Sequence, residues 1–166
     1  EPPVAGRSLL CSLLDMLTVQ LGSWPVAVES TQLVTASAKC GVDVLERRMR
    51  GETGHGADLL PQGMRQRVCE RLGKEFMTGE HVSAACASGS AALIRGAQSI
   101  LAGRCTQALV VAADLVTAFT MSGFSALHAL SPLPCRPFDA NRDGMSLGEG
   151  AAALLLMPLS RARELG

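Results

Sequence analysis

The chain has 166 residues, of which 48% are apolar, and equal numbers of acidic and basic residues give it a formal net charge of zero. This length suits one domain with a hydrophobic core of its own. A neutral chain without a block of lysines and arginines argues against a role at nucleic acid or at a membrane surface. No apolar run reaches the roughly 18 residues that a membrane-spanning helix needs.

The sequence shows no features of a secretory signal peptide. Its first residue is Glu1 rather than Met, so we expect a processed chain or part of a longer protein. The six cysteines form no Cys-x-x-Cys pair and no spacing typical of a metal site. Free thiols in a reducing cytoplasm are therefore the better interpretation, and a disulfide framework is the alternative.

In chain order, hydrophobic periodicity predicts a first helix over residues 6–21, whose leucines share one stripe. A short strand over 32–38 follows, then a helix over 41–50 and a second helix over 64–74.

The second half of the chain continues this alternation. A strand is expected over 80–85, a helix over 88–102 and an apolar strand over 107–114. A buried strand over 151–157 then leads into a short helix. Gly103 is placed to end the second of these elements, and residues 117–131 mix helix and loop. The alternation predicts an α/β fold, with a layered sheet covered on both faces, in one domain or one lobe of something larger.

The stretch "VSAACASGSAALIRG" places Cys86 among Ala, Ser and Gly, where a predicted strand ends and a helix begins. The positive end of a helix favours a thiolate, and its free N–H groups can stabilise an oxyanion on a carbonyl that the sulfur attacks. A sharp turn also needs small neighbours, as in the nucleophile elbow of hydrolases, although Gly-x-Ser-x-Gly itself is absent. A buried cysteine that only packs in the turn is the alternative, and the residues alone leave both open.

Three segments, in the same order and at plausible spacing, resemble β-ketoacyl-acyl-carrier-protein synthases, the condensing enzymes of fatty acid and polyketide synthesis. They are "ACASGSAALIRGAQSILAGRCTQALVVAAD", "GFSALHALSP" and "RPFDANRDGMSLGEGAAALLLMPLSRARELG". The resemblance covers about residues 34–166, and the first helix more loosely. It implies a thiolase-like layered fold, a mixed sheet covered by helices, with residues 1–166 forming a partial N-terminal ketosynthase-like domain. We expect this N-terminal half to be incomplete at its start, because the family's opening strand is not found.

The resemblance also implies roles for individual residues. Cys86 matches the nucleophile that receives the acyl chain as a thioester. Two apolar residues, Phe124 and Leu127, fall where the family's acyl chain runs, so we expect them to line its pocket, with core packing as the alternative. A loop that supports the cysteine in the family is expected to be fixed by ion pairs and turn hydrogen bonds, with Phe138 packed underneath. The residues expected to serve in this loop are Arg136, Phe138, Asp139, Asp143 and Glu149.

The same loop has a superficial likeness to a calcium site. Residues 139–144 fit the first half of an EF-hand loop, which requires a bidentate Glu at position twelve. Gly150 occupies that position and Glu149 falls one residue short, so no metal is predicted.

The implied reaction is decarboxylative Claisen condensation of an acyl thioester with malonyl-acyl-carrier protein, in fatty acid or polyketide synthesis. The family uses two histidines, a lysine and one oxyanion N–H from the second half of its fold. His55, His81 and His128 are expected to be surface or loop histidines that do not replace them. We therefore expect the isolated chain to be inactive in condensation and to need a C-terminal half or a complementary ketosynthase subunit.

No cofactor is expected, because the 4′-phosphopantetheine arm arrives with the acyl-carrier protein. A homo- or heterodimer is implied by resemblance, and Phe76 and Met77 could face the partner. The alternative function is that of a non-catalytic ketosynthase-like partner subunit or an acyl-carrier-protein-binding module. Another thiolase-fold acyltransferase is a third, weaker possibility.

Overall fold

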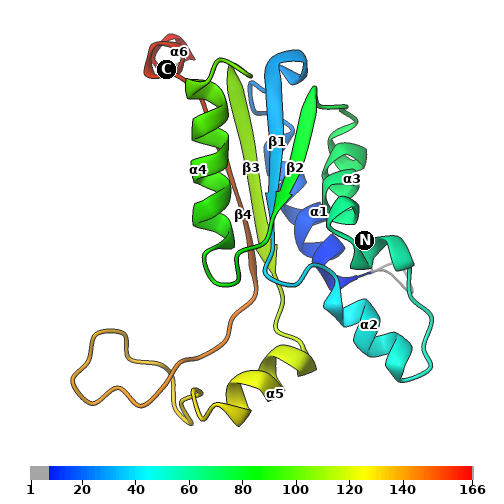
Figure 1. Ribbon diagram of the computed structural model, residues 1–166, viewed down its shortest axis with the longest axis vertical. Coiled ribbons are helices and arrows are strands. Elements are labelled where there is room, and N and C mark those ends of the chain that lie inside the picture. The colour runs from blue at the N-terminus through cyan, green and yellow to red at the C-terminus, as the bar shows by residue number, and fades with distance from the viewer. Residues whose placement is uncertain (1–7, 166) are drawn as a thin grey trace.

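A mixed four-stranded sheet forms the centre of the computed structural model, which describes residues 8–165 (Figure 1). Its strand order is β2-β1-β3-β4. Strands β1 (Thr31–Ala36), β2 (Thr78–Val82) and β3 (Gln107–Asp114) run parallel, and β4 (Gly150–Leu156) runs antiparallel to β3. The carboxyl ends of the three parallel strands therefore lie at one edge of the sheet, which we call the carboxyl edge.

The two central strands are almost entirely buried, as their runs of apolar and β-branched residues predict. Alternate residues of each strand face opposite layers. Leu33, Leu109 and Val111 belong to one apolar cluster, whereas Val34 and Val110 belong to another. The sheet thus separates two hydrophobic cores.

Helices α1 (Leu9–Leu21) and α3 (Pro61–Leu72) cover one face of the sheet, and α4 (Ser88–Leu101) covers the other (Figure 1). Close approach of α4 depends on its small residues. A Cβ atom at Gly96 would lie only 3.1 Å from the Cβ atom of Ala108, so a side chain there would require its neighbours to shift by a few tenths of an ångström.

Two helices lie beyond the carboxyl edge: α2 (Val42–Met49) and α5 (Ala118–Ala126) (Figure 1). The chain also forms two short 3-10 turns, η1 (Val28–Ser30) and η2 (Gly56–Leu59), and a last helix, α6 (Leu159–Leu165). None of the helices within residues 8–165 combines the length and apolar character needed to cross a membrane.

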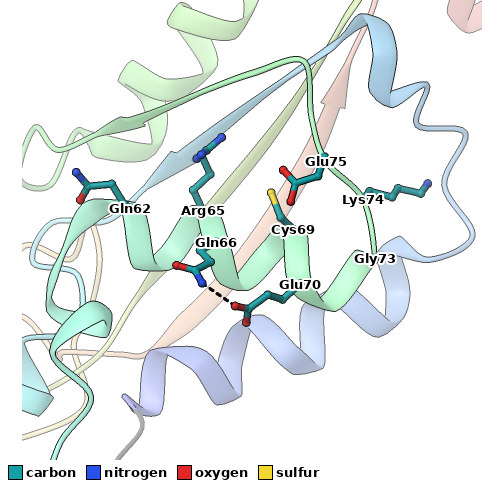
Figure 2. Close-up of a pocket in the computed structure, with 8 residues that line it drawn as sticks. All are labelled: Gln62, Arg65, Gln66, Cys69, Glu70, Gly73, Lys74 and Glu75. Carbon is teal, nitrogen blue, oxygen red and sulfur yellow. Dashed lines mark hydrogen bonds between the residues drawn. The ribbon is translucent and has the colours of Figure 1, made fainter.

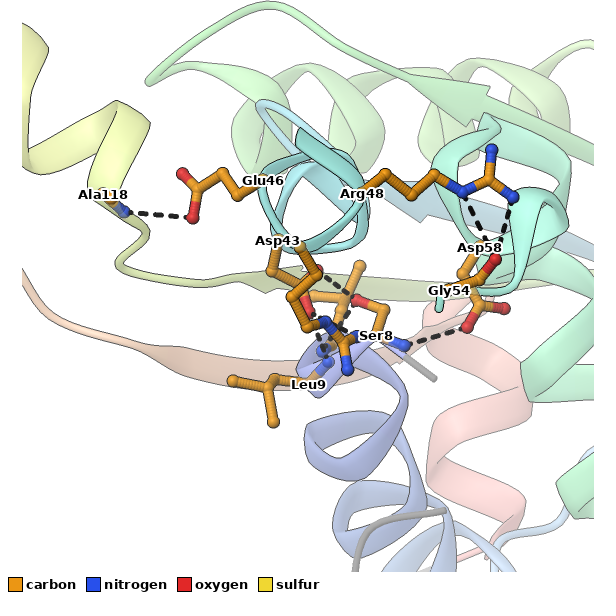
Figure 3. Close-up of polar contacts among 10 residues, drawn as sticks. Ser8, Leu9, Asp43, Glu46, Arg48, Gly54, Asp58 and Ala118 are labelled. Carbon is orange, nitrogen blue, oxygen red and sulfur yellow. Dashed lines mark hydrogen bonds and ion pairs between the residues drawn. The ribbon is translucent and has the colours of Figure 1, made fainter. Parts of the chain in front are cut away.

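A buried polar network fixes the start of α1 against α2 and η2 (Figure 3). Ser8 Oγ donates to Asp43 Oδ1 (2.6 Å), and the Leu9 N–H group donates to Asp43 Oδ2 (2.8 Å). The Ser8 N–H group donates to Asp58 Oδ2 at 2.9 Å. On the same helix as Asp43, Glu46 accepts the N–H group of Ala118 (3.3 Å) and so positions the start of α5.

The predicted α/β fold with a mixed sheet and flanking helices is confirmed. The strand predicted over 107–114 coincides with β3, and Gly103, at a φ of 67°, follows α4 as expected. The first two residues of the first predicted helix lie outside the described residues. None of the six cysteines, all of which lie within the described residues, forms a disulfide.

The strand predicted over residues 151–157 is present as β4, but the prediction that it is buried is wrong. Strand β4 lies at the edge of the sheet, where its residues alternate between exposed and half-buried, and Leu154 is 48% exposed. A continuous apolar run indicated full burial on both faces, but the β4 residues that contact the cores are only partly buried: Ala151, Ala153 and Leu155 pack against one core and Leu156 against the other.

Candidate active site at the carboxyl edge

Cys86 lies in the turn that joins β2 to α4, residues 83–87. Ala85, directly before it, has a φ of 49°, in the left-handed region that residues with a Cβ atom rarely adopt. The buried Ser88 stabilises this conformation, because its Oγ accepts the Ala84 N–H group (2.9 Å) and donates to the Ala85 carbonyl (2.7 Å). The strained turn with small neighbours is the kind of elbow that the sequence predicts.

The Cys86 side chain is exposed, so the alternative of a buried cysteine that only packs in the turn is wrong. The structure also limits which N–H groups can serve an oxyanion. Those of Ala87 and Ser88 are already paired with the carbonyls of Ala84 (3.0 Å) and Ala85 (3.2 Å). An oxyanion beside Cys86 would therefore need other donors.

A second cysteine lies at the same edge, in the loop between β1 and α2. Cys40 Sγ is 3.4 Å from Nε2 of His81, and Nδ1 of that ring is 3.0 Å from Oγ1 of the buried Thr35. Sequence reasoning missed this group, because its members come from two strands and a loop that only the parallel pairing of β1 and β2 brings together.

His81 corrects an expectation. It was predicted to be a surface or loop histidine, but it lies within β2 and is half-buried. Burial lowers the pKa of His81, and the opposing charge of Asp114 is the smaller effect. Burial and the same carboxylate both raise the pKa of the Cys40 thiol. The resting pair is thus a neutral thiol beside a neutral imidazole. His55 and His128 are exposed, as expected.

Asp114, the last residue of β3, holds the backbone of the Cys40 loop. Its Oδ1 accepts Ser37 Oγ–H (2.8 Å) and the Ala38 N–H group (2.9 Å). Ser37 Oγ in turn accepts the Cys40 N–H group at 2.8 Å. The loop also contacts the elbow, because Ser83 Oγ donates to the Ala38 carbonyl (3.2 Å).

The two predicted acyl-pocket residues line one groove of about 220 Å³. Phe124 is half-buried and Leu127 is 74% exposed, so core packing is wrong for Leu127. Lys39 forms the other wall, and its Nζ lies 5.6 Å from the centre of the Phe119 ring. The structure therefore brings an apolar groove and one cation together at the carboxyl edge.

The predicted supporting loop extends away from the body of the protein (Figure 1). Arg136 donates to the Asn141 carbonyl (2.5 Å) and lies 3.8 Å from Asp143, whose Oδ1 accepts Ser131 Oγ–H (2.7 Å). Asp139 Oδ1 accepts the Asn141 N–H group at 2.7 Å. The ion pair and turn hydrogen bonds expected of this loop are present, and support of Cys86 by them stays a prediction.

The other two residues expected to serve in this loop are Phe138 and Glu149. Phe138 was expected to pack underneath, and this is wrong: its side chain is fully exposed, at a φ of 66°, because the projecting loop offers it no apolar surface. Glu149 connects the two ends of the projecting segment, since its Oε1 accepts the Val116 N–H group (3.1 Å). Among residues 8–165 no cluster of three or more His, Cys, Asp or Glu could hold a metal ion.

A larger hollow, of about 560 Å³, lies along α3 and the turn that leads into the start of β2 (Figure 2). Its walls carry charges of both signs, and Cys69, whose pKa is raised by burial, is its only thiol. The reactive groups lie at the carboxyl edge instead, where open α/β sheets commonly bind ligands.

Comparison with known proteins agrees with this architecture. Residues 78–162 match the family model "Beta-ketoacyl synthase, N-terminal domain". The chain is 34% identical over 160 residues to a putative polyketide β-ketoacyl synthase 1 of Streptomyces cyaneus, covering 86% of the chain and 38% of that protein. It is 46% identical over 89 residues to polyketide synthase ThaG of Burkholderia thailandensis, covering 52% of the chain and 2% of that protein.

Solved structures share the fold. A β-ketoacyl synthase from Burkholderia phymatum superposes on 96% of the chain with a TM-score of 0.76 at 22% identity, and the match covers 44% of that protein. A chain of the complex between the ketosynthase ApeO and its chain length factor ApeC, from Xenorhabdus doucetiae, matches 84% of this chain with a TM-score of 0.67 at 26% identity, over 37% of its own length. The chain thus spans less than half the length of these relatives.

The sheet, its helical layers and these matches define a thiolase-like α/β fold of the ketosynthase type. The chain belongs to the β-ketoacyl synthase family and corresponds to its N-terminal part.

Proposed function

We propose that this chain supplies the acyl-accepting cysteine of a ketosynthase. The observation that carries the proposal is the exposed Cys86 in a strained strand-to-helix turn, inside the segment that matches the family model. The sulfur of Cys86 attacks the carbonyl carbon of an acyl thioester, and the thiol of the carrier leaves with the proton that Cys86 gives up. The product is an acyl thioester on Cys86.

The groove beside Lys39 is suited to the acyl chain, because Phe124 and Leu127 give it apolar walls at the same edge. The second step is decarboxylative condensation with malonyl-acyl-carrier protein: carbon dioxide leaves, the resulting enolate attacks the carbonyl carbon of the Cys86 thioester, and the carbon–sulfur bond breaks to release the Cys86 thiolate and the 3-ketoacyl-carrier protein. That step needs bases and oxyanion donors which residues 8–165 do not place beside Cys86, so the isolated chain is expected not to condense. No cofactor is needed besides the 4′-phosphopantetheine arm of the carrier protein.

A complementary ketosynthase subunit or C-terminal half is the second expected partner, in a homo- or heterodimer. Strand β2 forms an open edge of the sheet, where another strand can pair. Met77, just before it, is 48% exposed, whereas Phe76 is buried in the core and cannot face a partner.

A non-catalytic partner subunit is the second candidate function. It is favoured by structural neighbours that are complexes of a ketosynthase with a chain length factor, from Xenorhabdus doucetiae and from the ishigamide system. The exposed thiol of Cys86 favours the acyl-accepting function, because a subunit that only pairs has no need of it.

Intact-mass spectrometry tests the proposal. After incubation with acyl-carrier protein bearing an acyl group, we expect the mass of one acyl group on the peptide that contains Cys86. Cys86→Ala should abolish that peptide's adduct, whereas Cys135→Ala, which removes another exposed cysteine, should preserve it. Absence of an adduct on the Cys86 peptide would contradict the proposal, and 3-ketoacyl product from the chain alone would contradict the expected inactivity.

A further inference from the structure

The pair formed by Cys40 and His81 has a geometry suited to proton transfer. Thr35 Oγ1 is 3.4 Å from the Glu80 carbonyl and can donate its proton there, which leaves its lone pairs for the Nδ1–H group of His81. This tautomer presents an unprotonated Nε2 to the Cys40 thiol, at 3.4 Å. Thr35 therefore acts as a positioning residue for the imidazole.

The loop around Cys40 is held in a strained conformation that orients its thiol. The φ of Cys40 is 49°, in the left-handed region, and the hydrogen bonds to Ser37 and Asp114 maintain it. Such outliers persist only where the surroundings determine them, and they concentrate at functional sites. Cys40 is half-buried, so its sulfur remains partly accessible.

The position of the pair indicates the class of reagent. Cys40 shares the carboxyl edge with the Cys86 elbow, through the contact of Ser83 with Ala38. The apolar groove lined by Phe124 and Leu127 is also lined by Lys39, the residue directly before Cys40. A thioester whose acyl chain occupies that groove would bring its carbonyl group to this loop.

We propose that Cys40, with His81 as its proton acceptor, is a second acyl-accepting thiol of this chain. This inference rests on the proposed function only in taking an acyl thioester as the class of substrate. Cys40 Sγ attacks the carbonyl carbon of an acyl thioester as its proton passes to His81 Nε2. The leaving thiolate then takes that proton back from the imidazole, so the imidazole is regenerated and one thioester is exchanged for another.

The charges around the pair predict an unusual pH profile. Two titratable groups face the His81 ring: Cys40, in the loop between β1 and α2, and Asp114, at the end of β3. Arg95 of α4 forms an ion pair with Glu80 at 3.0 Å. Because burial lowers the pKa of His81, the imidazole is already neutral at pH 7. Acylation assisted by this base should be nearly constant from pH 7 to 8, whereas a thiol that reacts only as thiolate speeds up by about tenfold per pH unit.

The experiment uses Cys86→Ala, which leaves Cys40 as the acceptor, and hexanoyl-coenzyme A as the probe. We expect one hexanoyl group on the Cys40 peptide, formed at a rate that is flat over this pH range. His81→Gln, which can still hydrogen-bond Thr35, should slow the reaction at pH 7 by at least about tenfold and restore the steep pH profile. His55→Gln changes an exposed histidine and should alter neither.

Two results would overturn the inference: no adduct on the Cys40 peptide, or an unchanged rate and profile in His81→Gln. Circular dichroism would show that both variants are folded. The outcome is separable from that of the proposed function, because Cys40→Ala still offers Cys86. An adduct on Cys86 but none on Cys40 would remove this inference alone, and the reverse pattern would remove the proposed function alone.

Discussion

Residues 8–117 and residues 118–165 are stabilised in different ways. Every buried residue of the described chain lies in the first region, and none lies after Thr117. The second region depends on turn hydrogen bonds, on the pairing of β4 with β3 and on half-buried β4 side chains that pack against the cores, although it contains a long motif that resembles ketosynthases. A segment can therefore resemble the family in sequence without being buried in the core of this chain. The motif residues of the second region lie at its surface.

The largest expected effect comes from comparing the same substitution, leucine to alanine, in two neighbouring strands, one from each region. Leu109→Ala in β3 removes a fully buried side chain and should lower the free energy of unfolding by about 2–5 kcal/mol. Leu154→Ala in β4, where the side chain is 48% exposed, should cost less than about 1.5 kcal/mol. Urea unfolding measures both, and equal losses would break the contrast between the regions.

The next prediction concerns the Cys86 elbow in the first region, where the buried hydroxyl of Ser88 holds the turn. Ser88→Ala leaves the Ala84 N–H group without its acceptor and should cost about 1–3 kcal/mol, with slower acylation of Cys86. The control is Ser90→Ala, an exposed position two residues further along α4, which should change little. If both variants unfold at the same urea concentration, Ser88 does not hold the turn.

Asp15 of α1 provides a test by pH within the first region. Burial opposes its ionisation, but hydrogen bonds from Arg71 and Arg67 of α3 outweigh this and lower its pKa below 3.8. A lowered pKa contributes stability above the unfolded value, and that stability is lost as the pH falls through the folded pKa. Asp15→Asn should cost about 1 kcal/mol at pH 7, and the difference from the parent should shrink below about pH 4.

Thermal unfolding at pH 7 and at pH 3 measures this difference. Glu52→Gln is the matched control, because it removes an exposed pair with Arg50 and should show almost no pH-dependent loss. A constant difference between Asp15→Asn and the parent at both values would mean that the charge of Asp15 does not stabilise the α1–α3 contact.

The smallest effect belongs to the projecting loop. Asp143→Asn weakens an exposed contact with Arg136 and retains an acceptor for Ser131, so we expect a change within about 0.5 kcal/mol. Calorimetry is the suitable measurement. A loss well above that value would show that the loop is coupled to the core, which contradicts the contrast drawn above.

The sequence predicted what local patterns determine. The apolar run of β3 identified a central strand, and the small residues around Cys86 identified a turn between a strand and a helix, but they left open whether its cysteine is exposed. It failed where burial depends on neighbours: β4 is apolar but lies at an edge, and Phe138 is aromatic but fully exposed. The pairing of Cys40 with His81 could not be predicted, because parallel strand pairing alone brings together residues so far apart in the chain.

The antiparallel direction of β4 has a consequence for how the site can vary. Because Asp114 pairs with Gly150, residues 115–149 leave the carboxyl edge and return to it, joined at their base by Glu149 and Val116. In polymer terms this segment is a closed loop, and doubling the length of such a loop costs only about 0.6 kcal/mol. Insertions or deletions beyond that base can thus reshape the surroundings of both cysteines while the sheet register stays as it is.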